Sequence, residues 1–293
     1  MSKKKRWQDR RDAKRIKMPA MMRLMTYISD RQDSDVYINR KVDVTELVKY
    51  MKEKKKENSD LTYFHAFSIA IAKVIYNRPK LNRYIINHKC YERNDVILTF
   101  TAKVDFSDNA KEVMSLIKVD EQDNIFTISD KIKEKVNSFR NKKEQNSSDD
   151  SLDALDKLPG WLLKTIVAPV AKFMDRHDLL PSSLNNDLIY NSTVILSNLG
   201  SIKCGAIYHH LTNFGTNSIL VTIGDIHKEQ VVMPNGKVEI RDVVEFGINL
   251  DERIADGVYF SKAVNLLDYI LRNPKTLEGD ANERIEEKED FKY

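Results

Sequence analysis

A cluster of charged residues between positions 249 and 257 has the residue types of a proton-transfer site. The segment reads Asn-Leu-Asp-Glu-Arg-Ile-Ala-Asp-Gly, with ionisable side chains at Asp251, Glu252, Arg253 and Asp256. A carboxylate acts as a general base when its pKa approaches that of the group it deprotonates. Burial would raise the pKa of Glu252 toward that range, and the positive charge of Arg253 would lower it. The segment can therefore supply a general base if the fold excludes water from the carboxylate.

The elements on either side of this cluster are readable from the residue pattern. Residues 243–250 form an apolar run typical of a strand, and residues 258–272 carry an apolar stripe at helical spacing. A strand therefore leads into the cluster and a helix leads out of it. Asp256 and Gly257 are also residue types that begin a helix, so an ordinary helix cap is the alternative interpretation of that pair.

A second polar segment lies upstream, at the end of a predicted strand over residues 193–197. Ser197 and Asn198 open the sequence Ser-Asn-Leu-Gly, in which the serine hydroxyl is a candidate hydrogen-bond donor. The same four residues are good turn formers, which is the structural alternative. About a dozen residues later, His209 and His210 form a pair in a predicted loop. They are candidates for a substitute base, or else exposed loop residues.

Residues 251–257 resemble the active-site signature of the chloramphenicol acetyltransferase and dihydrolipoyl acyltransferase superfamily, which reads roughly Asp-His-Arg-Val-Ile-Asp-Gly. Asp251, Arg253, Asp256 and Gly257 match that pattern, and Glu252 stands where the family has its histidine base. Residues 192–200 are similar to the family segment Thr-Phe-Thr-Ile-Ser-Asn-Leu-Gly. Residues 37–47 and 62–84 look like two N-terminal blocks, so the resemblance spans roughly residues 22–272.

The resemblance implies an α/β two-layer sandwich, with a mixed sheet flanked by helices, that assembles as a homotrimer. It implies an acyl-coenzyme A substrate and an acceptor, a lipoyl group or small molecule, that meet in a channel between subunits. By position, Ser197 would donate to the oxyanion, and the base position is Glu252. Asp256 would be the third catalytic-site residue and would brace the site through an N-terminal arginine, with Arg23 the first candidate and Arg31 the second. The positions that would support the site structurally are Asn198, Arg253 and Gly257.

Replacement of histidine by glutamate makes proton transfer harder. Ordinary pKa values are about 4.3 for glutamate, 6.5 for histidine and 8.5 for a thiol, so Glu252 starts roughly 3 kcal/mol worse than histidine as a base toward a thiol. Three interpretations follow. Burial rescues Glu252, or His209 or His210 replaces it, or the chain is a catalytically inactive trimeric scaffold that keeps the fold.

Composition sets the remaining expectations. The 293 residues carry a net charge of +4, which argues against a specific nucleic-acid partner. We expect a basic, disordered tail over residues 1–17, one acyltransferase-like domain over residues 18–273, and an acidic tail over residues 274–293. The basic run could instead contact lipid or nucleic acid. Two cysteines give no disulfide or metal framework. The sequence predicts a cytoplasmic protein with no metal, no transmembrane segment and no lipoyl group on this chain.

Residues 158–177 form the most apolar predicted helix. It is too short to span a bilayer and is interrupted by Lys164, Pro169 and Lys172. Burial against the body of the protein or against a neighbouring subunit is the favoured role, and a position at a membrane surface is the alternative. Other helices are expected over residues 18–25, 61–77 and 125–143. A hairpin is expected around Pro234, Asn235 and Gly236.

Overall fold

A seven-stranded mixed sheet forms the centre of the molecule in a computed structural model, which describes residues 8–103, 112–141, 158–181 and 188–286. The strand order is β2-β10-β8-β7-β5-β6, and β9 pairs with the outer part of β10. β7 runs parallel to both β5 and β8, and the other pairs are antiparallel. The strands are β2 (Asp35–Asp43), β5 (Val96–Lys103), β6 (Glu112–Val119), β7 (Val194–Asn198), β8 (Ile219–Ile223), β9 (His227–Val232) and β10 (Val238–Asp251).

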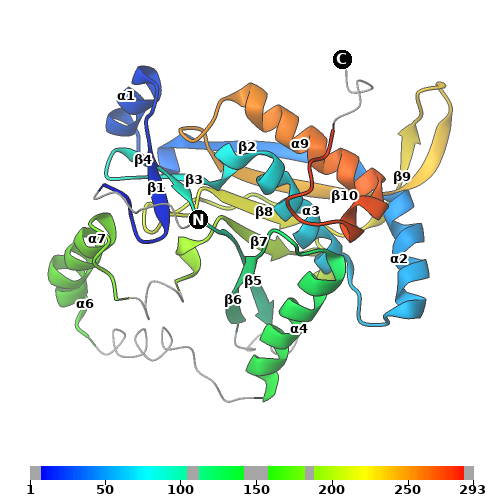
Figure 1. Cartoon of the computed structure of the whole chain (residues 1–293), viewed down its shortest axis with the longest axis horizontal. Coiled ribbons are helices and arrows are strands. Elements are labelled where there is room, and N and C mark those ends of the chain that lie inside the picture. Colours follow the sequence, from blue (N-terminus) through cyan, green and yellow to red (C-terminus); the bar gives the residue numbers. More distant parts are fainter. Residues whose placement is uncertain (1–7, 104–111, 142–157, 182–187, 287–293) are drawn as a thin grey trace.

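Helices cover one face of this sheet (Figure 1). Along β10, Val244, Phe246, Ile248 and Leu250 alternate with more polar residues and point into the helical layer, as expected for a strand with one covered face. The central helix α3 is hydrophobic and packs against both α9 and α4. The helices of this layer are α2 (Thr45–Glu57), α3 (Tyr63–Asn77), α4 (Ile125–Asn141) and α9 (Gly257–Arg272).

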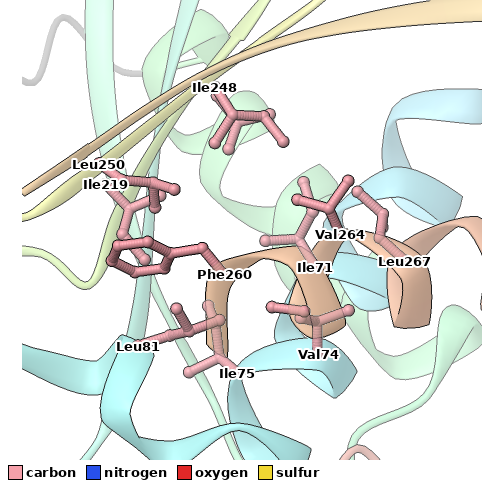
Figure 2. Close-up of a pocket in the computed structure, with 12 residues that line it drawn as sticks. Ile71, Val74, Ile75, Leu81, Ile219, Ile248, Leu250, Phe260, Val264 and Leu267 are labelled. Carbon is pink, nitrogen blue, oxygen red and sulfur yellow. The ribbon is translucent and has the colours of Figure 1, made fainter. Parts of the chain in front are cut away.

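An apolar cavity of about 50 Å³ lies between the helices and the sheet. Figure 2 shows aliphatic side chains of α3 and α9 meeting those of β8 and β10 around it, with Phe260 at one end. Its twelve lining residues are all apolar. This void belongs to the packing of the core and lies on the helical side of the sheet.

The N-terminal segment corrects the expectation of a disordered tail up to residue 17. Residues 13–16 form strand β1 (Ala13–Ile16), which pairs with β4 (Lys89–Arg93), and β4 pairs with β3 (Arg83–Ile86) in a second, three-stranded sheet. Ala13 is buried with Tyr84 and Tyr91, and this apolar cluster explains the order. Residues 1–7 lie outside the described part of the chain.

The C-terminal segment corrects the expected acidic tail in the same way. The 3-10 helix η6 (Pro274–Glu278) buries Leu277, and Ala281 follows it into the core. The fully buried ammonium of Lys73 donates to the carbonyl of Asp280 at 2.6 Å. The segment therefore completes the core as far as residue 286, and residues 287–293 lie outside the description.

Most predicted elements are confirmed. They include α3, α9 and the hairpin of β9 and β10, in which Gly236 takes a positive φ of 77°. The strand expected over residues 243–250 is the second half of a longer strand, β10, which begins at Val238, and strand β6 was not predicted. The helix expected over 18–25 is α1 (Ala20–Ile28).

The helix expected over residues 158–177 is present but has an irregular turn. It consists of α6 (Gly160–Leu162), the π-helical turn η3 (Leu163–Val167) and α7 (Ala168–Arg176), and it lies at the periphery of the molecule (Figure 1). Its Trp161 and Phe173 are exposed, so the chain itself covers only part of this helix, and burial against a neighbouring subunit stays a prediction. Among the described helices, none has the length and apolarity needed to cross a bilayer.

Candidate functional site

The charged cluster at the end of β10 is built around the carboxylate of Asp251. Arg253 donates from Nε to Asp251 Oδ1 and from Nη2 to Asp251 Oδ2, each at 2.8 Å. Arg31 also approaches this carboxylate, with 3.8 Å between its Nε and Asp251 Oδ2. Asp251 is fully buried, and both arginines are almost so. A buried carboxylate between two guanidinium groups is a rigid structural unit, because each ion would be costly to leave alone in the interior.

The remaining donors of the two arginines fix the surrounding loops. Arg31 donates to the carbonyls of Thr212 and Ile85, at 2.8 and 3.0 Å. Arg253 donates from Nη1 to the carbonyl of Ser29 at 2.8 Å. Burial lowers the pKa of Arg31 to about 10, although Asp251 acts in the opposite direction. The cluster thus joins the start of β2, the segment before β8 and the end of β10.

Glu252 turns outward from this cluster. Its backbone N–H donates to the carbonyl of Ser34 at 3.0 Å, which fixes the main chain, and its side chain is exposed in the single chain. The water-excluded environment that a carboxylate base requires is therefore not provided by its own chain. Another surface would have to cover it.

Asp256 acts as the N-cap of α9. Its Oδ1 accepts from the backbone N–H of Tyr259 at 2.9 Å, and its Oδ2 lies 4.0 Å from Nζ of Lys80. Among the described residues, the expected pairing with Arg23 is therefore not formed: Arg23 is exposed on α1. Arg31, the second candidate, contacts Asp251 instead. The reason is local, since an aspartate directly before a helix satisfies the free backbone donors of its first turn.

Ser197 lies on the face of the sheet opposite the helices. It stands beside Thr222 in the parallel pair of β7 and β8, and Thr222 stands beside Gly247 of β10. Residues directly opposite one another in a ladder point to the same face. Because Val221 and Ile248 point into the helical layer, Ser197, Thr222 and Gly247 point away from it. Ser197 is half-buried there, and Asn198 ends the strand.

A segment that includes residues 205–211 crosses this opposite face. The hydroxyl of Thr222 donates to the carbonyl of Ile207, and a side chain at Gly247 would collide with that same carbonyl. The backbone of His209 is held by the side-chain amide of Asn249. The segment can lie this close to the sheet because residue 247 has no Cβ.

His209 and His210 are both exposed on this segment. The charge of His210 acts on Asp35, the residue that pairs with Asp251 at the end of β10. Burial raises the pKa of Asp35, and hydrogen bonds from the backbone of Leu211 and the amide of Asn249 lower it. The histidine pair is therefore near the end of β10 and close to the charged cluster.

The strand register shows how far Ser197 lies from that cluster within one chain. Asp251 lies four positions beyond Gly247 along β10, and two strand spacings separate β7 from β10. A rise of about 3.4 Å per residue and a spacing of about 4.8 Å place the Cα atoms of Ser197 and Asp251 about 17 Å apart. A single chain therefore does not bring Ser197 and Glu252 into contact.

Two residues near the site had no distinct signal in the sequence. Asp35 and Asn249 contact each other and hold the segment that includes residues 205–211. The alternation of β2 and β10 could have placed them on the uncovered face, but their contact depends on the register of the two strands. A polar hollow of about 160 Å³ next to Arg31 and Arg253 was also not predicted. Within the described residues, no group of three His, Cys, Asp or Glu side chains has a metal-binding arrangement.

Comparison with known proteins identifies relatives of this arrangement. Residues 10–149 and 177–278 match the family described as 2-oxoacid dehydrogenases acyltransferase (catalytic domain). The lipoamide acyltransferase component of the branched-chain alpha-keto acid dehydrogenase complex of Bacillus subtilis (strain 168) is 24% identical over 238 residues. That alignment covers 79% of this chain and 45% of the relative, so the chain spans less than half of that protein.

Solved structures of low sequence identity share the fold. A probable dihydrolipoamide acetyltransferase from Listeria monocytogenes 4b F2365 superposes with a TM-score of 0.57 at 19% identity, over 89% of this chain and 94% of that one. The cubic core of the pyruvate dehydrogenase multienzyme complex gives 0.60 at 12%, over 88% of both chains. A chloramphenicol acetyltransferase gives 0.51 at 12%, over 88% and 99%. The predicted mixed α/β fold of this type is confirmed.

Proposed function

Because the chain belongs to the 2-oxoacid dehydrogenases acyltransferase (catalytic domain) family, we propose that it transfers an acyl group between coenzyme A and a thiol, hydroxyl or amine acceptor. The proposed site lies between two copies of the chain in a homotrimer. Ser197 of one copy faces Glu252 of the next. The observation that carries this arrangement is the separation of about 17 Å between Ser197 and Asp251 within one chain.

A related protein supports the choice of positions. The structure of Azotobacter vinelandii dihydrolipoamide acetyltransferase, with a TM-score of 0.60 at 14% identity over 88% of both chains, concerns the catalytic roles of a serine, a histidine and an asparagine. That histidine precedes that asparagine by four residues. Glu252 precedes Asp256 by the same spacing here. The serine of that protein would correspond to Ser197.

The proposed reaction needs one proton acceptor and one oxyanion donor. Glu252 takes the proton of the acceptor as its sulfur, oxygen or nitrogen attacks the acyl carbonyl. The carbonyl oxygen becomes negative and accepts a hydrogen bond from the Ser197 hydroxyl, a contact of the kind worth about 3 kcal/mol. When the intermediate collapses, the carbon–sulfur bond to coenzyme A breaks and the proton on Glu252 passes to the leaving thiolate.

The carboxylate base works only where water is excluded. Glu252 is exposed in one chain, while its backbone is held at Ser34 and its neighbour Asp251 is fixed by two arginines. A rigid main chain with an outward side chain suits a residue whose pocket is completed by another copy. Coverage by that copy would exclude water from the carboxylate, the condition under which a glutamate becomes a stronger base. His209 or His210 is the alternative base, since both lie near the same strand end.

An inactive scaffold is the second candidate function. Glutamate at the base position favours it, because an exposed carboxylate is a poor base toward a thiol. In that case the trimer would bind partners without turnover, and Asp251, Arg31 and Arg253 would preserve the fold.

The test measures coenzyme A release from acetyl-coenzyme A and a panel of other acyl-coenzyme A thioesters. Dihydrolipoamide, small alcohols and amines serve as acceptors. Wild type, Glu252→Gln and Ser197→Ala are compared. We expect acceptor-dependent release that falls at least about a hundredfold in Ser197→Ala, the usual effect of losing one oxyanion donor.

Each variant separates one interpretation from another. Loss of release in Glu252→Gln assigns the base to that carboxylate. Retention there, with loss in His209→Gln or His210→Gln, moves the base to the histidine pair. A wild type that releases no coenzyme A with any acceptor and still binds coenzyme A measurably would give a different answer. That result would contradict the proposed acyltransferase activity and would favour the inactive scaffold. A Glu252→His variant that gains activity over such an inert parent would show that only the base is missing.

A further inference from the structure

The peripheral helix over residues 160–176 presents an apolar face that its own chain leaves uncovered. Leu163, Val167 and Met174 are half-buried on the side toward the body. The neighbouring stripe remains open: at least half of the surface of each of its large side chains is exposed, namely Trp161, Ile166, Val170 and Phe173. A helix on the surface of a soluble protein needs only one apolar stripe, which packs against its own chain. The second, exposed stripe therefore requires a partner.

Among the described residues of the helix itself, the charged side chains that reach solvent are all positive. Lys164, Lys172 and Arg176 are exposed along the helix. The only acidic residue of the helix, Asp175, is buried and turns inward, where its carboxylate accepts from the backbone of Gly215 at 3.2 Å. An apolar stripe with a large indole and flanking cations is the pattern of a helix that lies at a membrane surface.

The basic N-terminal segment is attached to the same helix. Arg10 donates to the backbone carbonyl of Asp175 at 2.8 Å, just before the helix ends. Arg11 donates from its backbone to Asp178 at 2.7 Å and from its side chain to the carbonyl of Leu180 at 2.6 Å. In sequence, Lys3, Lys4, Lys5 and Arg6 directly precede this anchored segment. The fold therefore holds Arg10 and Arg11 against the C-terminal end of this helix.

The helix lies outside the pattern that the family shares. The family match covers residues 10–149 and 177–278 and omits 150–176. A subunit contact common to the family would not need this insertion. Lysine is also depleted in the core of protein–protein interfaces, whereas Lys164 and Lys172 flank this stripe.

We propose that the face formed by Trp161, Ile166, Val170 and Phe173 lies on an anionic lipid surface, with the exposed cations Lys164, Lys172 and Arg176 beside it. The apolar side chains enter the boundary between headgroups and acyl chains, and the lysines and arginines contact lipid phosphates. Neither the apolar face nor the positive charges would be sufficient alone, because a short helix buries little apolar area and isolated cations are screened by salt. Their combination gives reversible binding with a fixed orientation.

Tryptophan fluorescence of the full chain tests this proposal directly. The protein has two tryptophans, Trp7 and Trp161, so a Trp7→Phe chain reports on the helix alone. Its emission and its co-sedimentation are measured with vesicles of phosphatidylcholine, and with about two parts phosphatidylcholine to one part phosphatidylglycerol. We expect a blue shift and sedimentation only with the anionic vesicles, both declining as salt is raised.

A matched pair of substitutions separates the stripe from general surface effects. In the Trp7→Phe background, Ile166→Glu adds a charge to the stripe, and Ile240→Glu adds the same charge to a similarly exposed position on the hairpin. We expect partitioning to fall about tenfold for Ile166→Glu and to stay unchanged for Ile240→Glu. Replacing Lys164 and Lys172 together by glutamine should also weaken binding about tenfold.

Three results would overturn the proposal. The first is absence of a shift with anionic vesicles. The second is equal binding to neutral and anionic vesicles. The third is Trp161 emission already blue-shifted and protected from a soluble quencher without lipid, which would make a second copy of the chain the occupant of this face.

Discussion

At the scale of single residues, Asp251 has the most demanding environment near the candidate site. It is fully buried between Arg253 and Arg31, so its charge compensates two guanidinium groups that cannot reach solvent. Asp256, five residues later, is exposed and caps a helix. The two aspartates of the family signature thus have separate structural tasks, one in the interior and one at the surface.

Asp251→Asn should lower the free energy of unfolding by about 3 kcal/mol or more, because it removes the counter-charge of a buried cluster. Asp256→Asn should change it by less than about 0.5 kcal/mol, since asparagine caps helices as well as aspartate does. Urea denaturation of both variants measures the difference. Equal losses of stability would contradict the structural role of Asp251.

His65 makes the stability of the fold depend on pH. Burial lowers the pKa of His65 from 6.5 to about 4, and its neutral Nδ1 accepts the backbone N–H of Thr62 at the start of α3. Between about pH 4 and 6.5 the unfolded chain binds more protons than the folded one, so the free energy of unfolding rises with pH. The contribution of His65 is fully present above about pH 6.5. The contribution is up to about 3 kcal/mol.

His65→Gln removes this titration while keeping a side-chain acceptor for Thr62. The free energy of unfolding, measured by urea denaturation from pH 4 to 7, should rise less steeply in the variant than in wild type. Identical slopes would show that the histidine is solvated in the folded state.

At the scale of elements, the approach of the segment that includes residues 205–211 to β10 depends on Gly247. A methyl group there would meet the carbonyl of Ile207, so Gly247→Ala should push the segment with His209 and His210 off the sheet. We expect a loss of about 1–3 kcal/mol in stability, as for overpacking elsewhere. Amide hydrogen exchange should rise across the segment. Gly160→Ala adds the same methyl where nothing lies within 4 Å and should change neither quantity.

The elements that could be predicted are those whose pattern is local. Apolar spacing in α3 and α9, and the Asn235-Gly236 turn, determine their structure within a few residues of chain. The position of Ser197 at the end of a strand could likewise be predicted from its neighbours in the sequence. The partners of Arg31 and Asp256 could not be predicted, because they depend on which loops meet at the end of β10. Strand β1 was missed because its charged residues look like a tail, and only its pairing with β4 explains its order.

At the scale of the whole molecule, the proposed site requires two copies of the chain. Ser197→Ala and Glu252→Gln should each be inactive alone. Trimers assembled from equal amounts of both should regain activity in about a quarter of their sites, because a site then takes an intact serine and an intact glutamate from different chains. Coenzyme A release by the co-refolded mixture measures the recovery. A mixture as inactive as its components would place both residues in one chain's site.

The segment after α9 has a consequence for damaged chains. Every residue assigned to the candidate site precedes Pro274, so a chain cut at that point would keep the whole site in its sequence. It would nevertheless lose the carbonyl of Asp280 that binds the buried ammonium of Lys73, together with the side chains of Leu277 and Ala281. An unpaired ammonium in the core opposes folding. Incompletely synthesised or clipped copies should therefore be removed by proteolysis before they enter an assembly, so the end of the fold acts as a check on chain integrity.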